Sequence, residues 1–223
     1  MNEMAASEIV FLHTSDAHIA TFDALRARIA PEVKIRHILR ADLLEQAVAA
    51  GGVSSAVEAA ARDALAAAIG KETRVLVCTC STLGQVAEQH DADAPVPVMR
   101  IDRPMADQAV LQAKNIAVCA ALPTALSATA ALVRTSAEYM QKPNVMVRDH
   151  LFSAAWKHFE QGNMEAYAAE IARGLRGAAF SADLILLAQA SMEGAVALCQ
   201  DIAIPIWSSP ETGFRAALAL MED

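Results

Sequence analysis

The sequence predicts an α/β fold with mostly parallel sheets, on the basis of its apolar runs, the stretches between them and an internal repeat. Short runs of continuous apolar residues alternate with longer amphipathic, alanine-rich stretches. Strands that are buried on both faces of a sheet read as continuous apolar runs, and their alternation with helices favours parallel pairing. The expected strands are residues 9–12, 33–39, 74–78, 96–101, 115–120, 144–147, 183–188 and 204–207.

The stretches between these runs have the spacing of amphipathic helices. Phe22, Leu25 and Ile29 recur at helical spacing. A second series of small and apolar residues precedes Gly70, and glycine commonly ends a helix. Eight strands would also suit a TIM barrel, although 223 residues lie at the short limit for that fold.

An internal repeat favours two similar α/β lobes over a barrel. The apolar run at Val75 resembles the run at Leu184, and the run at Ile9 resembles the run at Ile116. Both pairs are separated by about half the chain, which is the signature of a duplicated unit. We expect lobe 1 to comprise residues 1–103 with a C-terminal helix at 208–223, and lobe 2 to comprise residues 104–207.

Composition excludes several classes of protein. The formal net charge of −8 provides no basic surface to neutralise phosphates, so we expect no nucleic-acid partner. The four cysteines have neither disulfide-framework nor zinc-ligand spacing, which favours a reducing, cytoplasmic compartment.

The uncharged stretch between Lys114 and Arg134 is interrupted by Pro123 and hydroxyl residues. We interpret that stretch as a buried strand, a turn and a helix, and we expect no membrane partner.

Loops at the carboxyl ends of parallel strands are where such folds bind ligands. Four of the expected loops, at residues 13–16, 79–82, 121–124 and 189–191, carry small hydroxyl or amide residues. In two of them Ser or Thr stands where a helix N-cap would be. A helix N-terminus offers free backbone N–H groups and a partial positive charge, which suits a carboxylate or a phosphate.

Cys80 is the candidate catalytic residue. It follows an apolar strand and stands at the start of an expected helix. A thiol in that position can have a lowered pKa, and the thiolate can act as a base or a nucleophile. Cys78, Cys119 and Cys199 lie inside strand or helix patterns, so we expect them to belong to the core.

These motifs resemble those of a known superfamily. Residues 77–84, Val-Cys-Thr-Cys-Ser-Thr-Leu-Gly, resemble the first cysteine motif of the aspartate/glutamate/hydantoin racemase superfamily, and residues 97–105 resemble the segment that follows it. Residues 120–124 resemble its carboxylate-binding turn, and residues 187–192 stand where the second cysteine motif belongs. The resemblance spans nearly the whole chain. It implies two pseudo-symmetric flavodoxin-like lobes, with the active site in the cleft between them.

The resemblance also implies a mechanism, from which this sequence departs. Racemases of the superfamily use two cysteines, one per lobe, to remove and return a proton on opposite faces of the substrate carbon without metal or cofactor. Cys80 matches the first cysteine, but the repeat places Gln189 at the position of the second. An amide cannot act as a general acid or base at neutral pH.

The reaction class therefore stays open among racemisation with another second acid, isomerisation and decarboxylation. Arylmalonate decarboxylases in the superfamily use a single cysteine, although theirs belongs to the second lobe. A non-catalytic protein that binds small anions is a further alternative. His13, with Asp16 and His18 nearby, could supply the missing proton because imidazole titrates near neutral pH.

We therefore expect a cofactor-independent, racemase-like isomerase with Cys80 as the catalytic residue and a small carboxylate or amino-acid-like compound as substrate. No motif calls for a metal, a flavin or a nucleotide. Alanine-rich helix faces would permit a homo-oligomer. The expected substrate-binding residues are His13, Thr14, Ser15, Ser81, Thr82, Thr124, Gln189, Ala190 and Ser191.

Overall fold

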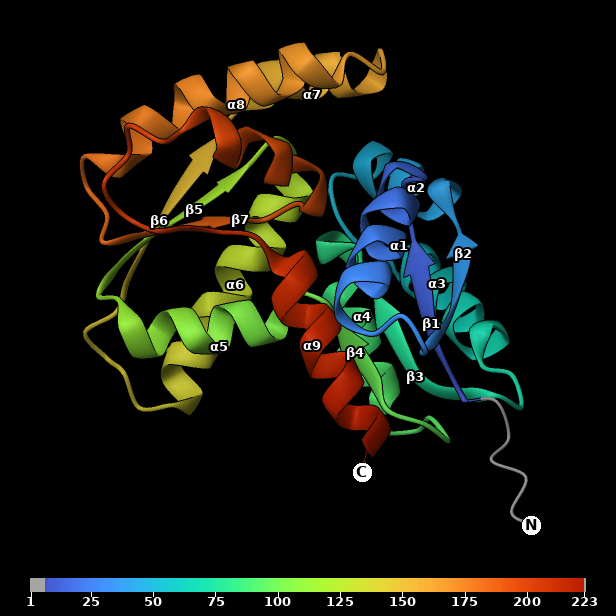
Figure 1. Ribbon diagram of the computed structural model, residues 1–223. Coiled ribbons are helices and arrows are strands. Elements are labelled where there is room, and N and C mark those ends of the chain that lie inside the picture. Colours follow the sequence, from blue (N-terminus) through green and yellow to red (C-terminus); the bar gives the residue numbers. More distant parts are fainter. Residues whose placement is uncertain (1–6, 223) are drawn as a thin grey trace. The chain divides into compact units, whose positions relative to one another are not determined.

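The computed structural model describes residues 7–222, which form two compact units (Figure 1). Unit 1 contains the residues up to Ile101 and those from Pro210 onward, and unit 2 is Asp102–Ser209. Each unit has a four-stranded parallel sheet flanked by helices. The α/β fold class expected from the sequence is therefore confirmed, and the single closed barrel is wrong for the described residues.

Unit 1 is built on a sheet with the strand order β2-β1-β3-β4. Its strands are β1 (Glu8–His13), β2 (Lys34–Leu39), β3 (Thr73–Cys78) and β4 (Val98–Arg100). Its helices are α1 (Ala17–Ile29), α2 (Ala41–Ala49), α3 (Ser55–Ala68), the short 3₁₀ helix η1 (Ser81–Leu83), α4 (Gly84–Asp91) and α9 (Ser209–Glu222).

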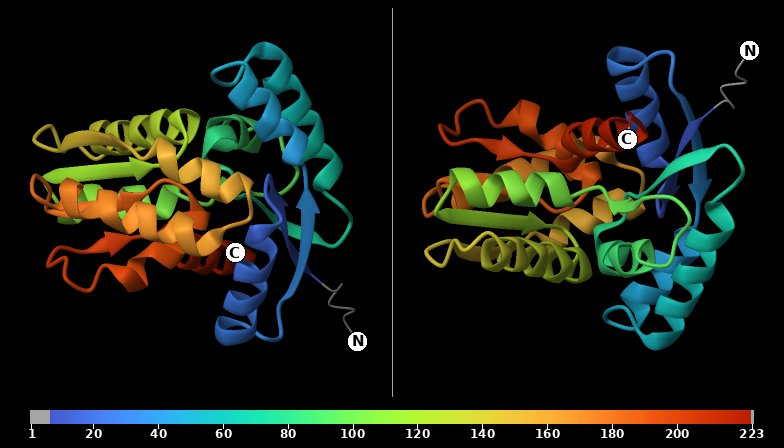
Figure 2. Two further views of the ribbon diagram at one scale, coloured as in Figure 1. Left: turned by 90° about the horizontal axis from the view of Figure 1, so that it is seen from above. Right: turned by 90° about the horizontal axis from the view of Figure 1, so that it is seen from below.

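The sheet of unit 1 is buried on both faces, which explains its apolar runs. Phe11 of β1 packs with Phe22 of α1 and Phe214 of α9 on one face. Leu12 of the same strand packs on the other face with Leu65 of α3. Successive residues of a strand point to opposite faces, so each run supplies both cores. Figure 2 shows α1 and α3 on opposite sides of this sheet.

Unit 2 repeats the arrangement with the strand order β6-β5-β7-β8. Its strands are β5 (Asn115–Ala120), β6 (Met146–Leu151), β7 (Leu184–Leu187) and β8 (Ile206–Trp207). Its helices are α5 (Arg103–Gln112), α6 (Pro123–Tyr139), α7 (Ser153–Glu160), α8 (Met164–Ala179) and the 3₁₀ segment η2 (Ala190–Leu198). Figure 2 shows α6 and α8 on opposite sides of β5.

The two sheets correspond strand by strand, which accounts for the repeat in the sequence. β1 and β5 are the second strands in their sheets, and β3 and β7 are the third. The backbone N–H of Thr79 donates to the carbonyl of Leu12 at 3.1 Å, and that of Ala188 donates to the carbonyl of Cys119 at 2.9 Å. Equivalent residues after the third strand therefore make equivalent bonds. The order 2-1-3-4 is that of flavodoxin-like sheets.

Two elements differ from their expected form. β6 spans Met146–Leu151, whereas the sequence indicated residues 144–147. It is an edge strand with mostly exposed or half-buried residues, so charged side chains such as Arg148 and Asp149 interrupt its apolar pattern. The segment after β7 is a nine-residue 3₁₀ stretch, where the sequence indicated the start of a helix.

None of the described helices is both long enough and apolar enough to cross a membrane.

Candidate functional site

The carboxyl ends of β1 and β3 lie side by side in unit 1. Leu12 pairs with Cys78 across the two strands. In a sheet of this order the chain turns to opposite sides after these two strands, and ligands bind in the crevice formed there. The imidazole Nδ1 of His13 lies 2.8 Å from the Oγ1 of Thr79. The structure therefore brings together the first two loops that the sequence singled out.

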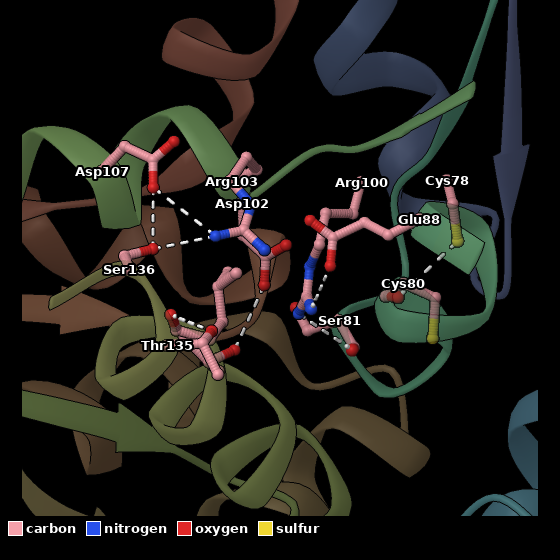
Figure 3. Close-up of polar contacts among 12 residues, drawn as sticks. Cys78, Cys80, Ser81, Glu88, Arg100, Asp102, Arg103, Asp107, Thr135 and Ser136 are labelled. Atoms are coloured by element: carbon pink, nitrogen blue, oxygen red, sulfur yellow. Dashed lines mark hydrogen bonds and ion pairs between the residues drawn. The ribbon is translucent and has the colours of Figure 1, made fainter. Parts of the chain in front are cut away.

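Cys80 follows β3 in extended conformation, with φ −95° and ψ 110°, and immediately precedes η1. Its side chain is 6% exposed and belongs to the core cluster that contains Leu12 and Leu83. The thiol of Cys78 donates to the carbonyl of Cys80 at 3.7 Å, a contact visible in Figure 3. All four cysteines are free and buried. Burial raises the pKa of the Cys119 thiol and of the Cys199 thiol above the ordinary thiol value.

The hydroxyl residues after β3 lie inside the first helical turn. Ser81 and Thr82 are buried and form the first two residues of η1. The N-cap residue is Cys80, and it makes no side-chain capping bond. In unit 2 the N-cap of α6 is Leu122, which places Thr124 within the helix. The expectation that these hydroxyls cap helices is wrong, because η1 begins at Ser81 and α6 at Pro123, so the N-cap positions fall on Cys80 and Leu122.

Arg100, at the end of β4, packs against the turn that carries Cys80. Its side chain is 3% exposed, and its Nη1 lies 3.5 Å from Oε2 of Glu88. Its Nη2 donates to the carbonyl of Ser81 at 3.5 Å, and Figure 3 shows the guanidinium between these two partners. A Cβ at Gly84 would come within 2.5 Å of the guanidinium carbon. Arg100 therefore stabilises the first helical turn through the carbonyl of Ser81. Its guanidinium packs so closely against Gly84 that a larger residue would clash there.

A signal for Arg100 is present in the sequence, since a charged residue ends the apolar run of β4 at its carboxyl edge. Arg100 lies within residues 97–105, the second segment of the superfamily resemblance, but that resemblance implies no role for it. In unit 2, Figure 3 shows a separate polar cluster: Arg103 Nη1 donates to Oγ of Ser136 at 2.9 Å, and Ser136 donates to Asp107 at 2.7 Å. This cluster joins α5 to α6.

Three imidazoles gather at the carboxyl edge of β1. The ring of His13 lies 5.0 Å from that of His37 and 5.9 Å from that of His18, measured between centroids. Burial lowers the pKa of His13 to about 3 and that of His18 to about 4. Both are therefore neutral at neutral pH. His37 was missed in the sequence, although register places it opposite Phe11 in β2, on the face that His13 shares.

The loop after β1 contains the other two residues expected there to bind substrate. Thr14 is buried, and Ser15 accepts a hydrogen bond from the backbone N–H of Ala17 at 3.3 Å. The N-cap of α1 is Asp16, without a side-chain capping bond. The Nδ1 of His18 is buried and has no hydrogen-bond partner among the described residues.

In unit 2, Gln189 bridges the ends of β5 and β7. Its Oε1 accepts the backbone N–H of Ala121 at 2.7 Å and that of Leu122 at 3.2 Å. These are the amides of the turn expected to bind a carboxylate, so the side chain itself supplies their acceptor. Ala190 is buried, and the Oγ of Ser191 lies 3.0 Å from the hydroxyl of Tyr167, whose pKa burial raises to about 12.

Cys80 and Gln189 occupy the same position in their units. Each is the second residue after the third strand of its sheet, and each is the extended residue that precedes a 3₁₀ turn. Their φ and ψ angles are −95° and 110° for Cys80 and −123° and 132° for Gln189. One unit thus presents a thiol where the other presents an amide.

The described residues contain no group of three or more His, Cys, Asp or Glu side chains arranged to hold a metal ion. The candidate site in unit 1 contains a thiol, three imidazoles, several hydroxyls and a buried guanidinium. Such groups can transfer protons and can form hydrogen bonds with a small polar ligand.

Comparison with solved structures finds racemases. Glutamate racemase from Bacillus anthracis matches with a TM-score of 0.72 and 14% identity, over 98% of this chain and 83% of that one. Allantoin racemase from Pseudomonas fluorescens matches with a TM-score of 0.64 and 17% identity, over 97% and 91% of the two chains. Aspartate racemase from Picrophilus torridus matches with a TM-score of 0.60 and 13% identity, over 96% and 92%.

The chain therefore has the two-unit α/β fold of these racemase structures. No family model matches the sequence, and no curated protein matches it either.

Proposed function

We propose that this protein is a racemase-like enzyme of the aspartate/glutamate/hydantoin racemase superfamily, which moves a proton at a carbon of a small carboxylate with a single thiol, Cys80. The observation that supports this most is the equivalence of Cys80 and Gln189. A thiolate can remove a proton from carbon and return it as a thiol, whereas an amide cannot act as a general acid or base near neutral pH.

The proposed step is simple to balance. The Cys80 thiolate takes the proton on the carbon next to the carboxylate, the C–H electron pair passes into the carboxylate as an enediolate, and the thiol returns a proton to carbon. The chemistry requires no cofactor, because the thiolate is the base. Hydroxyls of the turn that carries Cys80 would form hydrogen bonds with the substrate, and hydrogen-bond donors stabilise the developing oxyanion.

Decarboxylation is the second candidate, and the same equivalence favours it. Loss of carbon dioxide from a malonate-type substrate leaves the enediolate directly, so only one proton must then be delivered. A single thiol is sufficient for that delivery, whereas inversion at carbon needs proton carriers on both faces.

A panel of amino acids, hydantoins and substituted malonates in deuterium oxide tests both candidates. We expect the wild-type protein to place deuterium on the substrate carbon, and Cys80→Ser to lose this by at least about a hundredfold, since general acid–base groups contribute roughly 10²–10⁴ in rate. Cys199→Ser is the matched control, because Cys199 is also buried and free but lies in unit 2. Equal exchange by the wild type and Cys80→Ser would contradict the proposal.

A further inference from the structure

Cys78 and Cys80 form a pair of thiols of which the proposed reaction uses only one. They stand two residues apart, and both side chains belong to the core cluster that contains Leu65 of α3. Successive residues of a strand point to opposite faces, so residues two apart share a face. Thr79 between them points to the other face, where its Oγ1 lies 2.8 Å from Nδ1 of His13. Cys78 itself has no part in the proposed reaction.

The sulfur of Cys78 is directed toward Cys80. Its thiol donates to the carbonyl of Cys80 at 3.7 Å (Figure 3). At the rise of an extended strand, Cα atoms two residues apart are separated by about 6.7 Å. That separation lies just within the range of up to about 6.8 Å that a disulfide bridges. β3 ends at Cys78, so the backbone of Cys80 lies beyond the paired residues and can shift without loss of strand pairing.

The two thiols differ in their access to solvent. Cys80 is 6% exposed, whereas Cys78 is 1% exposed. A small oxidant such as hydrogen peroxide therefore meets Cys80 first, and the thiolate that the proposed function requires is also the form that peroxides oxidise. A bulky thiol such as glutathione has little room to reach so deeply buried a sulfur. The thiol that is placed to react with an oxidised Cys80 is Cys78.

We propose that Cys78 and Cys80 are a redox pair, in which a hydroperoxide oxidises Cys80 and Cys78 then closes a disulfide with it. The formation of this bridge depends only on the two cysteines. Its consequence for catalysis rests on the proposed function, because the bridge removes the thiol that would move the proton.

The oxidation balances in two steps. The thiolate of Cys80 attacks the hydroperoxide, the O–O bond breaks, and Cys80 becomes a sulfenic acid while the other oxygen leaves as hydroxide or alkoxide. That base takes the proton of the Cys78 thiol. The Cys78 thiolate attacks the sulfur of Cys80, so that an S–S bond forms and the S–O bond breaks. The hydroxide released takes up the proton that Cys80 lost on ionisation. Two thiols are thus oxidised, and one hydroperoxide is reduced to water, or to water and an alcohol.

The bridge would keep the catalytic thiol recoverable. A sulfenic acid with no thiol beside it is oxidised further to sulfinic acid, which thiols do not reduce. A disulfide is reduced by thiol–disulfide exchange, and strained bridges are the more readily reduced. The pair therefore inactivates the enzyme under peroxide in a form from which a reductant restores it.

Peptide masses test the pair without a substrate. Cleavage after Lys and Arg releases residues 75–100 as one peptide, which contains Cys78 and Cys80 and no other cysteine. The folded protein is treated with hydrogen peroxide, its remaining thiols are alkylated in denaturant, and it is digested without reductant. We expect this peptide to carry no alkyl group and to be lighter than the reduced peptide by two hydrogen atoms. Dithiothreitol before alkylation should restore two alkylated thiols.

The same digest contains its control. Residues 115–134 form a peptide whose only cysteine is Cys119, which is also buried and free, and we expect its thiol to be alkylated after the same treatment. Fragmentation locates any oxygen added to Met99 of the first peptide. If residues 75–100 carry two alkylated thiols, or a sulfinic acid with no bridged form, the redox pair is overturned.

Cys78→Ala separates the redox pair from oxidation of Cys80 alone. It retains Cys80, so deuterium exchange into substrate before oxidation should equal that of the wild type. After peroxide and then dithiothreitol, the wild type should recover most of its exchange and Cys78→Ala little of it, because its Cys80 is oxidised to sulfinic acid. Cys119→Ala is the matched control and should recover like the wild type. Equal recovery by Cys78→Ala would overturn the redox pair. If no protein exchanges deuterium at all, the proposed function fails while the peptide masses still decide the bridge.

Discussion

The imidazoles of His13 and His37 share a hydrogen bond of 2.8 Å between Nε2 of the first and Nδ1 of the second. An imidazole in such a pair must donate with one nitrogen and accept with the other, or carry a charge. The bond therefore links the protonation of a half-buried ring on β2 to the tautomer of a fully buried ring on β1.

Stability should depend on pH because of the buried imidazoles. The pKa values of His13 and His18 fall from 6.5 to about 3 and about 4 in the folded chain. The unfolded chain therefore binds more protons below about pH 6.5, and stability is lost as pH falls from about 6.5 towards about 4 for His18 and about 3 for His13. Urea unfolding at half-unit pH steps should show a loss of a few kcal/mol, at about 1.4 kcal/mol per pH unit and titrating group.

His13→Asn should remove part of that slope, because asparagine does not titrate. His158→Asn is the control, since it replaces a histidine of unit 2 outside the cluster. A slope that is the same in all three proteins would contradict the assignment of the pH dependence to His13.

His18→Phe should not weaken the fold. The Nδ1 of His18 is buried without a partner among the described residues, and a buried unsatisfied polar atom costs about 1–3 kcal/mol. Phenylalanine keeps a ring of similar shape against His13 and removes the unbonded nitrogen. We expect an equal or higher unfolding temperature at pH 7 and a clearer gain at pH 5, where the unfolded histidine binds a proton. A marked fall in unfolding temperature at both pH values would show that the imidazole makes a necessary bond.

Gly84→Ala should destabilise unit 1. The new Cβ would lie 2.5 Å from Cζ and from Nε of Arg100, which is buried and paired with Glu88. Overpacking of this kind costs about 1–3 kcal/mol. Gly177→Ala in α8 is the matched control: nothing lies within 4 Å of its Cβ, and alanine in a helix should add roughly 0.5–1 kcal/mol. Denaturant midpoints that shift alike in the two variants would disprove the role of Arg100.

Gln189→Leu should weaken unit 2, because the backbone N–H groups of Ala121 and Leu122 would lose their common acceptor. The expected cost is about 1–3 kcal/mol in urea unfolding. Gln189→Glu should retain most of the stability, since a carboxylate accepts the same two bonds and is favoured near the N-terminus of α6. If Leu and Glu prove equally stable, the two hydrogen bonds contribute little.

The strands buried on both faces could be predicted from the sequence, whereas the bounds of the exposed edge strand β6 could not. Residues 75–78 and 116–120 read as continuous apolar runs because helices cover both faces of β3 and β5. β6 lies at a sheet edge, where polar residues are tolerated, so its sequence pattern misplaced it. Edge strands lack the alternation or continuity that burial imposes.

For the candidate site, the sequence indicated the loops but not the contacts within them. The positions of His13 and Cys80 follow from strand ends, which apolar runs mark clearly. The bonds of His37 and Arg100 depend on neighbouring strands brought together from distant parts of the chain. The side-chain bond of Gln189 to the turn after β5 likewise required knowledge of which strands are adjacent. No local pattern encodes such adjacency.

The position of α9 bears on the order in which the protein can mature on the ribosome. The ring centroid of Phe214 in α9 lies 6.0 Å from that of Phe11 in β1, yet Phe214 follows all of unit 2 in the sequence. Unit 2 is a continuous segment, so synthesis completes it before unit 1 has received its last helix. Domains generally fold as units during synthesis. The unit that begins first is thus the last to be finished, and until then the ring of Phe11 lacks one of its aromatic neighbours.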